Sequence, residues 1–224
     1  MKKEYVYRGM IYSLGVLIQS IGVALHTKTG LGVPPVASVS FGISEIWSLN
    51  FALVNFFAYL IFICGEILLQ KKAYLSNFFQ LPFSFAFNFL LNVFGGWITY
   101  DRTAHGTLLN IGVLVLAVVL SAAGASLTVG MRLVANPGDG ITFALSERIG
   151  WSQGFTKNVV DLTAVSLVLA MGLFFTGHVV GVGLGTLVAM FGTGRVMAVT
   201  DRLMERNVLR LAGLAPEREV VENS

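Results

Sequence analysis

Long apolar runs alternate with short polar stretches along the whole chain. Each run is close to the roughly 20 residues that an α-helix needs to cross the hydrocarbon core of a bilayer. The pattern therefore predicts six transmembrane helices, near Tyr7 to Leu25, Asn50 to Gln70, Leu75 to Trp97, Leu108 to Val129, Phe155 to Gly177 and Val180 to Met204.

Composition supports a membrane protein. Charged residues make up 12% of the 224 residues and apolar residues 55%, whereas soluble domains carry roughly 25% charged residues. The spans and their short loops use nearly the whole length, so residues 1–224 are expected to form a single membrane domain. The net charge of +3 comes from Lys and Arg scattered over loops, which argues against a nucleic-acid partner.

The positions of the basic residues predict the orientation, because cytoplasmic loops carry an excess of Lys and Arg. With the N-terminus inside, only Lys28 and Arg102 face outward. We therefore expect a multi-pass protein of the cytoplasmic (inner) membrane with both termini in the cytoplasm and a polar tail at 206–224. The basic residues on or near the inner side are Lys2, Lys3, Arg8, Lys71, Lys72, Arg132, Arg148, Lys157, Arg202, Arg206 and Arg210.

Two loops resemble one another. When the segment 30–45 is laid over the segment 132–147 with Pro35 on Pro137, identical residues coincide at several further positions. Such self-similarity at a fixed offset indicates an internal repeat. The matched pairs are Gly22 with Gly124, Leu25 with Leu127, Leu31 with Leu133, Phe41 with Phe143, Ser44 with Ser146 and Glu45 with Glu147.

The repeat predicts an inverted topology. Each copy, about 5–100 and about 105–205, holds three spans, and an odd number makes the second copy enter the membrane from the opposite side. The charge bias agrees, since it places the first matched loop outside and the second inside. We therefore expect an all-α membrane protein with a 3+3 inverted-topology repeat, an arrangement typical of secondary transporters.

Each matched loop continues into a helical stretch that is too short to span. A half-helix that dips into the bilayer would present unpaired N–H groups and a partial positive charge to a polar or anionic solute. An amphipathic helix lying on the membrane surface fits the same residues, and both interpretations stay open. Under the first, the candidate solute-binding residues of the loops are Pro35, Ser38, Asn136, Asp139, Gly140 and Thr142. Asp139 is equally interpreted as a helix N-cap.

Charged residues inside spans form the second group of candidates, because they are costly in lipid and therefore mark functional sites by default. Asp161 and Arg195 are expected at similar depth, where they could form an ion pair or take part in a solute path. Lys157, one turn before Asp161, is an alternative partner. Glu66 is expected to snorkel from the inner end of its span.

Other residues carry weaker signals. The glycines from Gly181 to Gly185 allow close helix packing, and the amide side chains within the spans either line a polar path or join helices. The three histidines, His26, His105 and His178, are expected exposed at the outer face. With one cysteine, no metal-ligand cluster and no catalytic constellation in the sequence, we expect no enzyme activity, no cofactor and no metal.

The second half resembles the bacterial YczE/YyaS/YitT-type membrane proteins. The resemblance rests on the segment 133–140, on the basic and acidic pair Lys157 and Asp161, and on the Gly-x-Gly-x-Gly-Thr stretch at 181–186. The first half agrees at 30–35 but has Val36 and Ala37 where the family often has an aromatic and an acidic residue. The resemblance implies a multi-pass cytoplasmic-membrane protein of unsettled activity, often described as a transporter.

Two functions follow from these observations. The first is a small-solute transporter with a site between the two repeats. The alternative is a non-transporting membrane module that binds a ligand or a partner subunit, or a second copy of the chain, through its glycine-rich last span. The two differ in a testable way, since a transporter should show half-helices meeting at a polar cavity open to one side.

Overall fold

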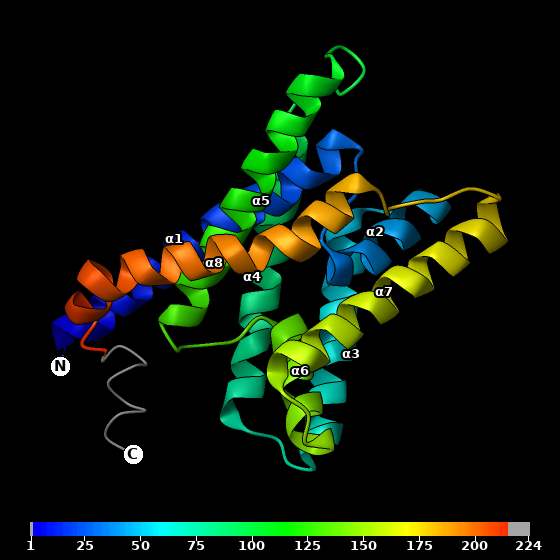
Figure 1. The fold of residues 1–224 in the computed structure, drawn as a ribbon. Coiled ribbons are helices and arrows are strands. Elements are labelled where there is room, and N and C mark those ends of the chain that lie inside the picture. Colours follow the sequence, from blue (N-terminus) through cyan, green and yellow to red (C-terminus); the bar gives the residue numbers. More distant parts are fainter. Residues whose placement is uncertain (1, 215–224) are drawn as a thin grey trace.

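The computed structural model describes residues 2–214, and in this range the chain forms helices and no strands. The helix lengths repeat in order, because one long helix, one helix of 13 residues and two long helices occur twice (Figure 1). The helices are α1 (Lys2–Thr29), α2 (Pro35–Trp47), α3 (Phe51–Gln70), α4 (Leu75–Trp97), α5 (Thr107–Gly130), α6 (Pro137–Ile149), α7 (Gln153–Thr176) and α8 (Leu184–Leu211).

Within the described residues, five helices are long and apolar enough to cross a membrane, namely Lys3–Thr29, Phe51–Gln70, Leu75–Trp97, Thr107–Gly130 and Gln153–Thr176. Five of the six predicted spans are therefore confirmed as helices of spanning length and composition. The sixth span stays a prediction, because α8 contains Arg195, Asp201 and Arg202 and does not meet the same criterion in its described part.

α8 also continues beyond the predicted end of its span. Leu209, and Ala212 just after the end of α8, are buried against Met131 and Met204. The chain therefore stays packed past residue 206, where a polar tail was expected. Residues 215–224 of that tail lie outside the described part of the chain.

Local sequence signals explain where the two short helices begin and end. Proline occupies the first turn of both, a position where the missing N–H costs nothing. Ser48 directly after α2 and Gly150 directly after α6 adopt the left-handed conformation that terminates a helix. The same device of a polar N-cap starts the next helix in both halves, with Asn50 before α3 and Ser152 before α7.

α1 and α5 pack along one another in opposite directions, and glycine makes their close approach possible. A Cβ at Gly22 would lie 2.7 Å from the Ser121 Cα, and a Cβ at Gly124 would lie 2.7 Å from the Gln19 Cα. Further along, the guanidinium of Arg8 donates to the Met131 carbonyl at 2.8 Å, so the start of α1 meets the end of α5.

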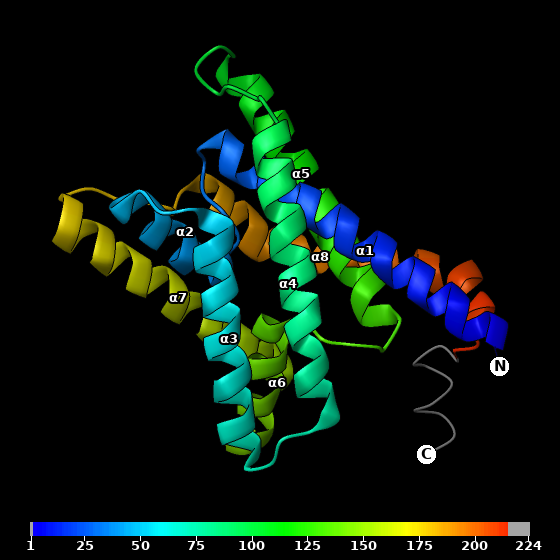
Figure 2. The same ribbon diagram turned by 180° about the vertical axis from the view of Figure 1, so that it is seen from behind.

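The remaining helices are arranged crosswise. α2 packs on α7 from the other half, and α6 packs on α3 (Figures 1 and 2). α4 covers α1 and α3, where Phe83 and Phe87 join the core with Val16 and Tyr59, and α8 covers α5. α3 and α4 pack together along their lengths, whereas α7 and α8 diverge from their connection at 177–183 (Figure 1).

Candidate functional site

The starts of α2 and α6 face a common cavity of about 750 Å³, which we call the half-helix cavity. Its lining includes Pro34, Val36 and Ala37 around the start of the first short helix, and Asn136, Gly138, Asp139 and Gly140 around the start of the second. Both short helices therefore begin inside the protein, which favours the half-helix interpretation over helices that lie on the membrane surface.

Polar side chains from six further helices complete the lining of the half-helix cavity. They come from α1, α3, α4, α5, α7 and α8, so residues far apart in the sequence meet here. These side chains are Gln19, Asn55, Tyr59, Glu66, Gln70, Ser76, Gln80, Ser121, Gln153, Lys157 and Thr193. Ser76, Gln153 and Gly154 are exposed and mark the side on which the cavity opens.

Asn136 ties the start of α6 to α3. Its carbonyl oxygen accepts from the Gly138 N–H at 2.9 Å, and its amide donates to the Tyr59 hydroxyl at 3.1 Å. Asn136 is thus the N-cap of α6, and Asp139, which sequence reasoning offered for that role, is left to face the cavity. Thr142, another predicted site residue, also lines the cavity but donates its hydroxyl to the Gly138 carbonyl.

Glu66 lies at the centre of a buried amide cluster. It is 5% exposed, and its two carboxylate oxygens accept from the Gln70 and Gln80 amides at 3.1 and 2.8 Å. Gly140 of α6 lies against this cluster, since a Cβ there would come within 3.1 Å of the Gln80 Nε2. The expectation that Glu66 snorkels is therefore wrong, because its partners hold the carboxylate inside the protein.

Asp161 pairs with Lys157 on the same helix, with Nζ and Oδ1 2.5 Å apart. Lys157 lines the half-helix cavity, while Asp161 is buried behind it. The alternative pair of Asp161 with Arg195 is not formed, because the Arg195 guanidinium donates to the Phe191 carbonyl of its own helix at 3.3 Å. The divergence of α7 from α8 accounts for this.

Two predicted site residues of the first half lie beside the half-helix cavity and do not line it. Pro35 and Ser38 are both buried, and the Ser38 hydroxyl donates to the Pro35 carbonyl at 2.6 Å. Their sequence neighbours Pro34, Val36 and Ala37 form the wall in their place.

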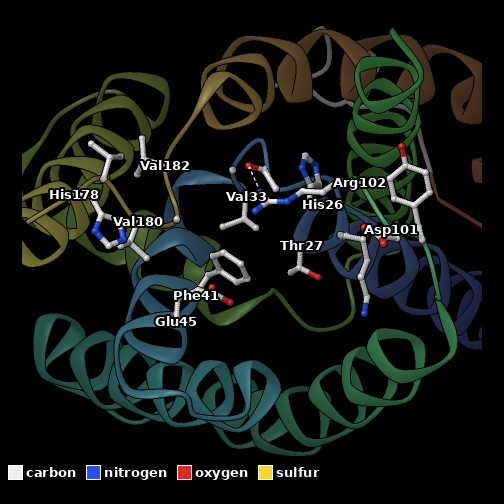
Figure 3. Close-up of a pocket in the computed structure, with 16 residues that line it drawn as sticks. His26, Thr27, Val33, Phe41, Glu45, Asp101, Arg102, His178, Val180 and Val182 are labelled. Atoms are coloured by element: carbon white, nitrogen blue, oxygen red, sulfur yellow. Dashed lines mark hydrogen bonds between the residues drawn. The ribbon is translucent and has the colours of Figure 1, made fainter. Parts of the chain in front are cut away.

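A second cavity, of about 540 Å³, lies beyond the start of α2 and is called the loop cavity here. The connections at 98–106 and 177–183 line it together with the end of α1, and Figure 3 shows His26, Arg102 and His178 around it. His105 and His178 are exposed as predicted, but His26 is fully buried, so that expectation is wrong. Hydrogen bonds from Thr103 hold the pKa of the neighbouring Asp101 below its usual value.

A short segment separates the two cavities. Gly32 and Val33 line the loop cavity, whereas Pro34 lines the half-helix cavity, and Val33 is fully buried. The segment is fixed by the start of α8, where the Gly185 N–H donates to the Leu31 carbonyl at 2.7 Å. The glycine-rich stretch 181–185 packs against this segment and also against helices, since a Cβ at Gly185 would lie 2.9 Å from the Leu114 side chain of α5 and a Cβ at Gly181 would lie 3.3 Å from the Gly42 nitrogen of α2.

A model of a family of unknown function (DUF6198) matches residues 6–202. The chain belongs to this family. It is also similar to two proteins of Bacillus subtilis (strain 168), the uncharacterized protein YyaS and the uncharacterized membrane protein YczE.

Both relatives match along most of their length. YyaS is 24% identical over 202 residues, which cover 89% of this chain and 95% of the relative. YczE is 24% identical over 199 residues, which cover 88% and 86%. No solved structure matches. The likeness to a membrane protein and the five apolar helices together establish a multi-pass helical membrane protein, and the resemblance noted in the sequence is confirmed.

Sequence reasoning missed Glu66, Gln80 and Tyr59 as members of the candidate site. Glu66 carried a usable signal, since it is an acidic residue inside an apolar span. Nothing in the sequence indicated that Gln80 would lie beside it, because α3 and α4 meet there only after folding.

Proposed function

We propose that this protein is a small-solute transporter of the cytoplasmic membrane and that its solute binds in the half-helix cavity, between two inverted structural repeats. The observation that carries the proposal is the convergence of the two half-helix starts on one polar cavity. Non-helical backbone at membrane depth is tolerated where it lines such a cavity, and transporters with inverted repeats bind their substrates at this kind of place.

The α1–α5 contact supports the inverted repeat. Gly22 meets Ser121 while Gly124 meets Gln19, and both Gly22 with Gly124 and Gln19 with Ser121 are 102 residues apart, as Pro35 and Pro137 are. Reciprocal contacts of this type are the property of a two-fold axis. An axis through the α1–α5 crossing relates two antiparallel helices, as an inverted topology requires.

The crosswise packing follows the same pattern. α2 on α7 corresponds to α6 on α3 under the 102-residue offset, and so do the N-caps Asn50 and Ser152. With the span order predicted from basic residues, the half-helix cavity opens toward the cytoplasm and the loop cavity toward the outside. Both termini then lie in the cytoplasm.

The two cavities suggest how solute would pass. They approach one another across the Gly32–Pro34 segment, so a small movement of this segment relative to α8 would change the side to which the site is open. α3 and α4 are packed while their counterparts α7 and α8 diverge, which is the asymmetry expected of a state open to one side only.

Accessibility of single cysteines tests the transport mechanism. With Cys64, which is exposed, replaced by serine, one reporter replaces Gln153 in the half-helix cavity and another replaces Thr27 in the loop cavity. A transported solute should change their reaction rates with a water-soluble thiol reagent in opposite directions. Equal changes, or solute binding without flux into proteoliposomes, would favour the non-transporting ligand-binding module instead.

Topology is tested separately. Cysteines at Lys28 and Arg148 should be labelled from opposite sides of intact cells, with Lys28→Cys on the outside. Labelling of both cysteines from the same side of the membrane would contradict the inverted topology of the two repeats.

A further inference from the structure

The unpaired polar atoms of the half-helix cavity are of one kind. Three lining residues, Gln19, Gln70 and Gln80, have a buried side-chain carbonyl oxygen with no hydrogen-bond partner in the described structure. Gln80 is only 2% exposed, and leaving such an acceptor unpaired costs about 1–3 kcal/mol. The buried unpaired atoms of the lining are therefore hydrogen-bond acceptors, which a ligand with N–H donors would satisfy.

The orientation of two of these amides is fixed by chemistry. An amide can be turned by 180° without changing its shape, but an ionised carboxylate accepts hydrogen bonds and donates none. Glu66 accepts from Gln70 and Gln80 at once, so both NH₂ groups must point at the carboxylate. Their oxygens then point away from it, and both remain acceptors.

The charges of the lining lead in the same direction. Glu66, Asp139 and Lys157 are its charged members, and Lys157 is already paired with Asp161. In the described residues no hydrogen bond reaches the Asp139 side chain. Lys157 also acts electrostatically on Asp139, but this one ammonium group is shared with Asp161, so the carboxylates around the cavity outnumber its basic groups.

The partial positive charge of α6 does not reverse this balance. Asn136 caps the helix through the Gly138 N–H. Asp139 places a negative charge in the first turn, and this charge offsets the partial positive charge of the helix N-terminus. The start of α2 has no side-chain cap, but its dipole amounts to only about half a charge. The lining as a whole is electronegative.

The size and walls of the cavity favour an organic ligand over a bare metal ion. About 750 Å³ lies in the range of small-molecule pockets, roughly 300–1,000 Å³. Tyr59, Phe87 and Phe143 contribute aromatic surface to the lining, and aromatic rings attract organic ammonium groups.

We propose that the half-helix cavity binds a small organic cation that carries N–H donors, with Glu66 and the Gln80 carbonyl oxygen receiving its ammonium group and Asp139 as the second carboxylate. This inference rests on the proposed function, since it names the solute class of the same cavity. It differs from the anionic solute that half-helix dipoles alone would favour.

The test measures thermal unfolding of the purified protein in lipid nanodiscs, which a ligand of the native state shifts to higher temperature. The probes are primary alkylammonium and arylalkylammonium ions, each beside the carboxylate and the alcohol of the same carbon skeleton, at constant ionic strength. At least one ammonium ion should raise Tm in a concentration-dependent way while its matched carboxylate and alcohol do not. Sodium and potassium chloride are measured alone.

Variants connect this effect to the named groups. Glu66→Gln and Asp139→Asn should each raise the ammonium concentration needed for half the Tm shift by about tenfold or more, because each removes a counter-charge. Glu147→Gln is the matched control, since Glu147 is an exposed carboxylate of α6, and it should behave as the wild type. Asp139→Asn keeps the test decisive if Glu66→Gln does not fold, because the Asp139 carboxylate takes part in no hydrogen bond within the described residues.

Three results would overturn the inference: stabilisation by the carboxylates instead of the ammonium ions, an ammonium effect that survives both substitutions, or the full effect with sodium or potassium alone. The proposed function fails differently. Ammonium binding without flux into proteoliposomes would support this site and exclude transport, whereas flux of an anion without ammonium binding would do the reverse.

Discussion

The crossing of α1 and α5 offers a sharp test of the tertiary structure through Gly22→Ala. A Cβ at Gly22 would lie 2.7 Å from the Ser121 Cα and closer still to its backbone nitrogen. Backbone atoms cannot rotate out of the way as a side chain can. The two helices must therefore separate, although the new methyl group is small.

The magnitude follows from two opposing terms. Overpacking costs typically about 1–3 kcal/mol, and we expect about 2–3 kcal/mol because the contact is with backbone. Alanine in a helix is favoured over glycine by about 1 kcal/mol, which offsets part of the loss. Gly9→Ala and Gly112→Ala supply that second term alone, since a Cβ at either of these glycines of α1 and α5 meets no atom within 4 Å.

The assay is equilibrium unfolding in mixed detergent micelles, followed by circular dichroism as the fraction of SDS is raised. Gly22→Ala should be less stable than Gly9→Ala by about 2–3 kcal/mol, and Gly124→Ala should be less stable than Gly112→Ala by a similar amount. The Gly22→Ala and Gly124→Ala double variant should lose clearly less than the sum, because one separation of the helices relieves both contacts.

Two outcomes would refute this reasoning. If Gly22→Ala and Gly9→Ala have equal stability, α1 and α5 do not approach as closely as the structure shows. If the effects of Gly22→Ala and Gly124→Ala on stability add in full, the two glycines do not lie at one helix crossing. This result would also contradict the two-fold relation between α1 and α5.

Further predictions concern the site and the segment between the cavities. Asn136→Ala should cost about 1–2 kcal/mol in the same unfolding assay, because it removes the cap of α6, whereas Tyr59→Phe removes one hydrogen bond and should cost about 1 kcal/mol; equal stability of Asn136→Ala and the wild type would contradict the cap. Gly32→Ala should prevent stable folding, since its φ is +107° and a Cβ would lie 2.7 Å from the Gly183 nitrogen; normal yield and Tm of the purified variant would contradict this packing. Asp161→Asn should free Lys157, so the ammonium effect on Tm should weaken; an unchanged effect would show that Lys157 does not face the site.

Much of the architecture was predictable because a bilayer imposes simple rules. Apolar runs near 20 residues in length predict spanning helices, and proline or asparagine before a helix fixes where it starts. The short helical stretches predicted after the two matched loops are accordingly found, as α2 and α6, each beginning at a proline. Arg195 and Asp201 blur the sixth span, because charges lower its hydropathy without preventing a helix.

The sequence by itself determined the membrane class, most of the helices and the two short elements, since these depend on local composition and periodicity. Only the tertiary structure decided which polar groups meet. It brought Glu66 of α3 to Gln80 of α4, buried His26, and separated Asp161 from Arg195. Side-chain contacts between helices depend on how the helices rotate and cross, and those angles are set by packing such as that of Gly22 on Ser121, which no local pattern encodes.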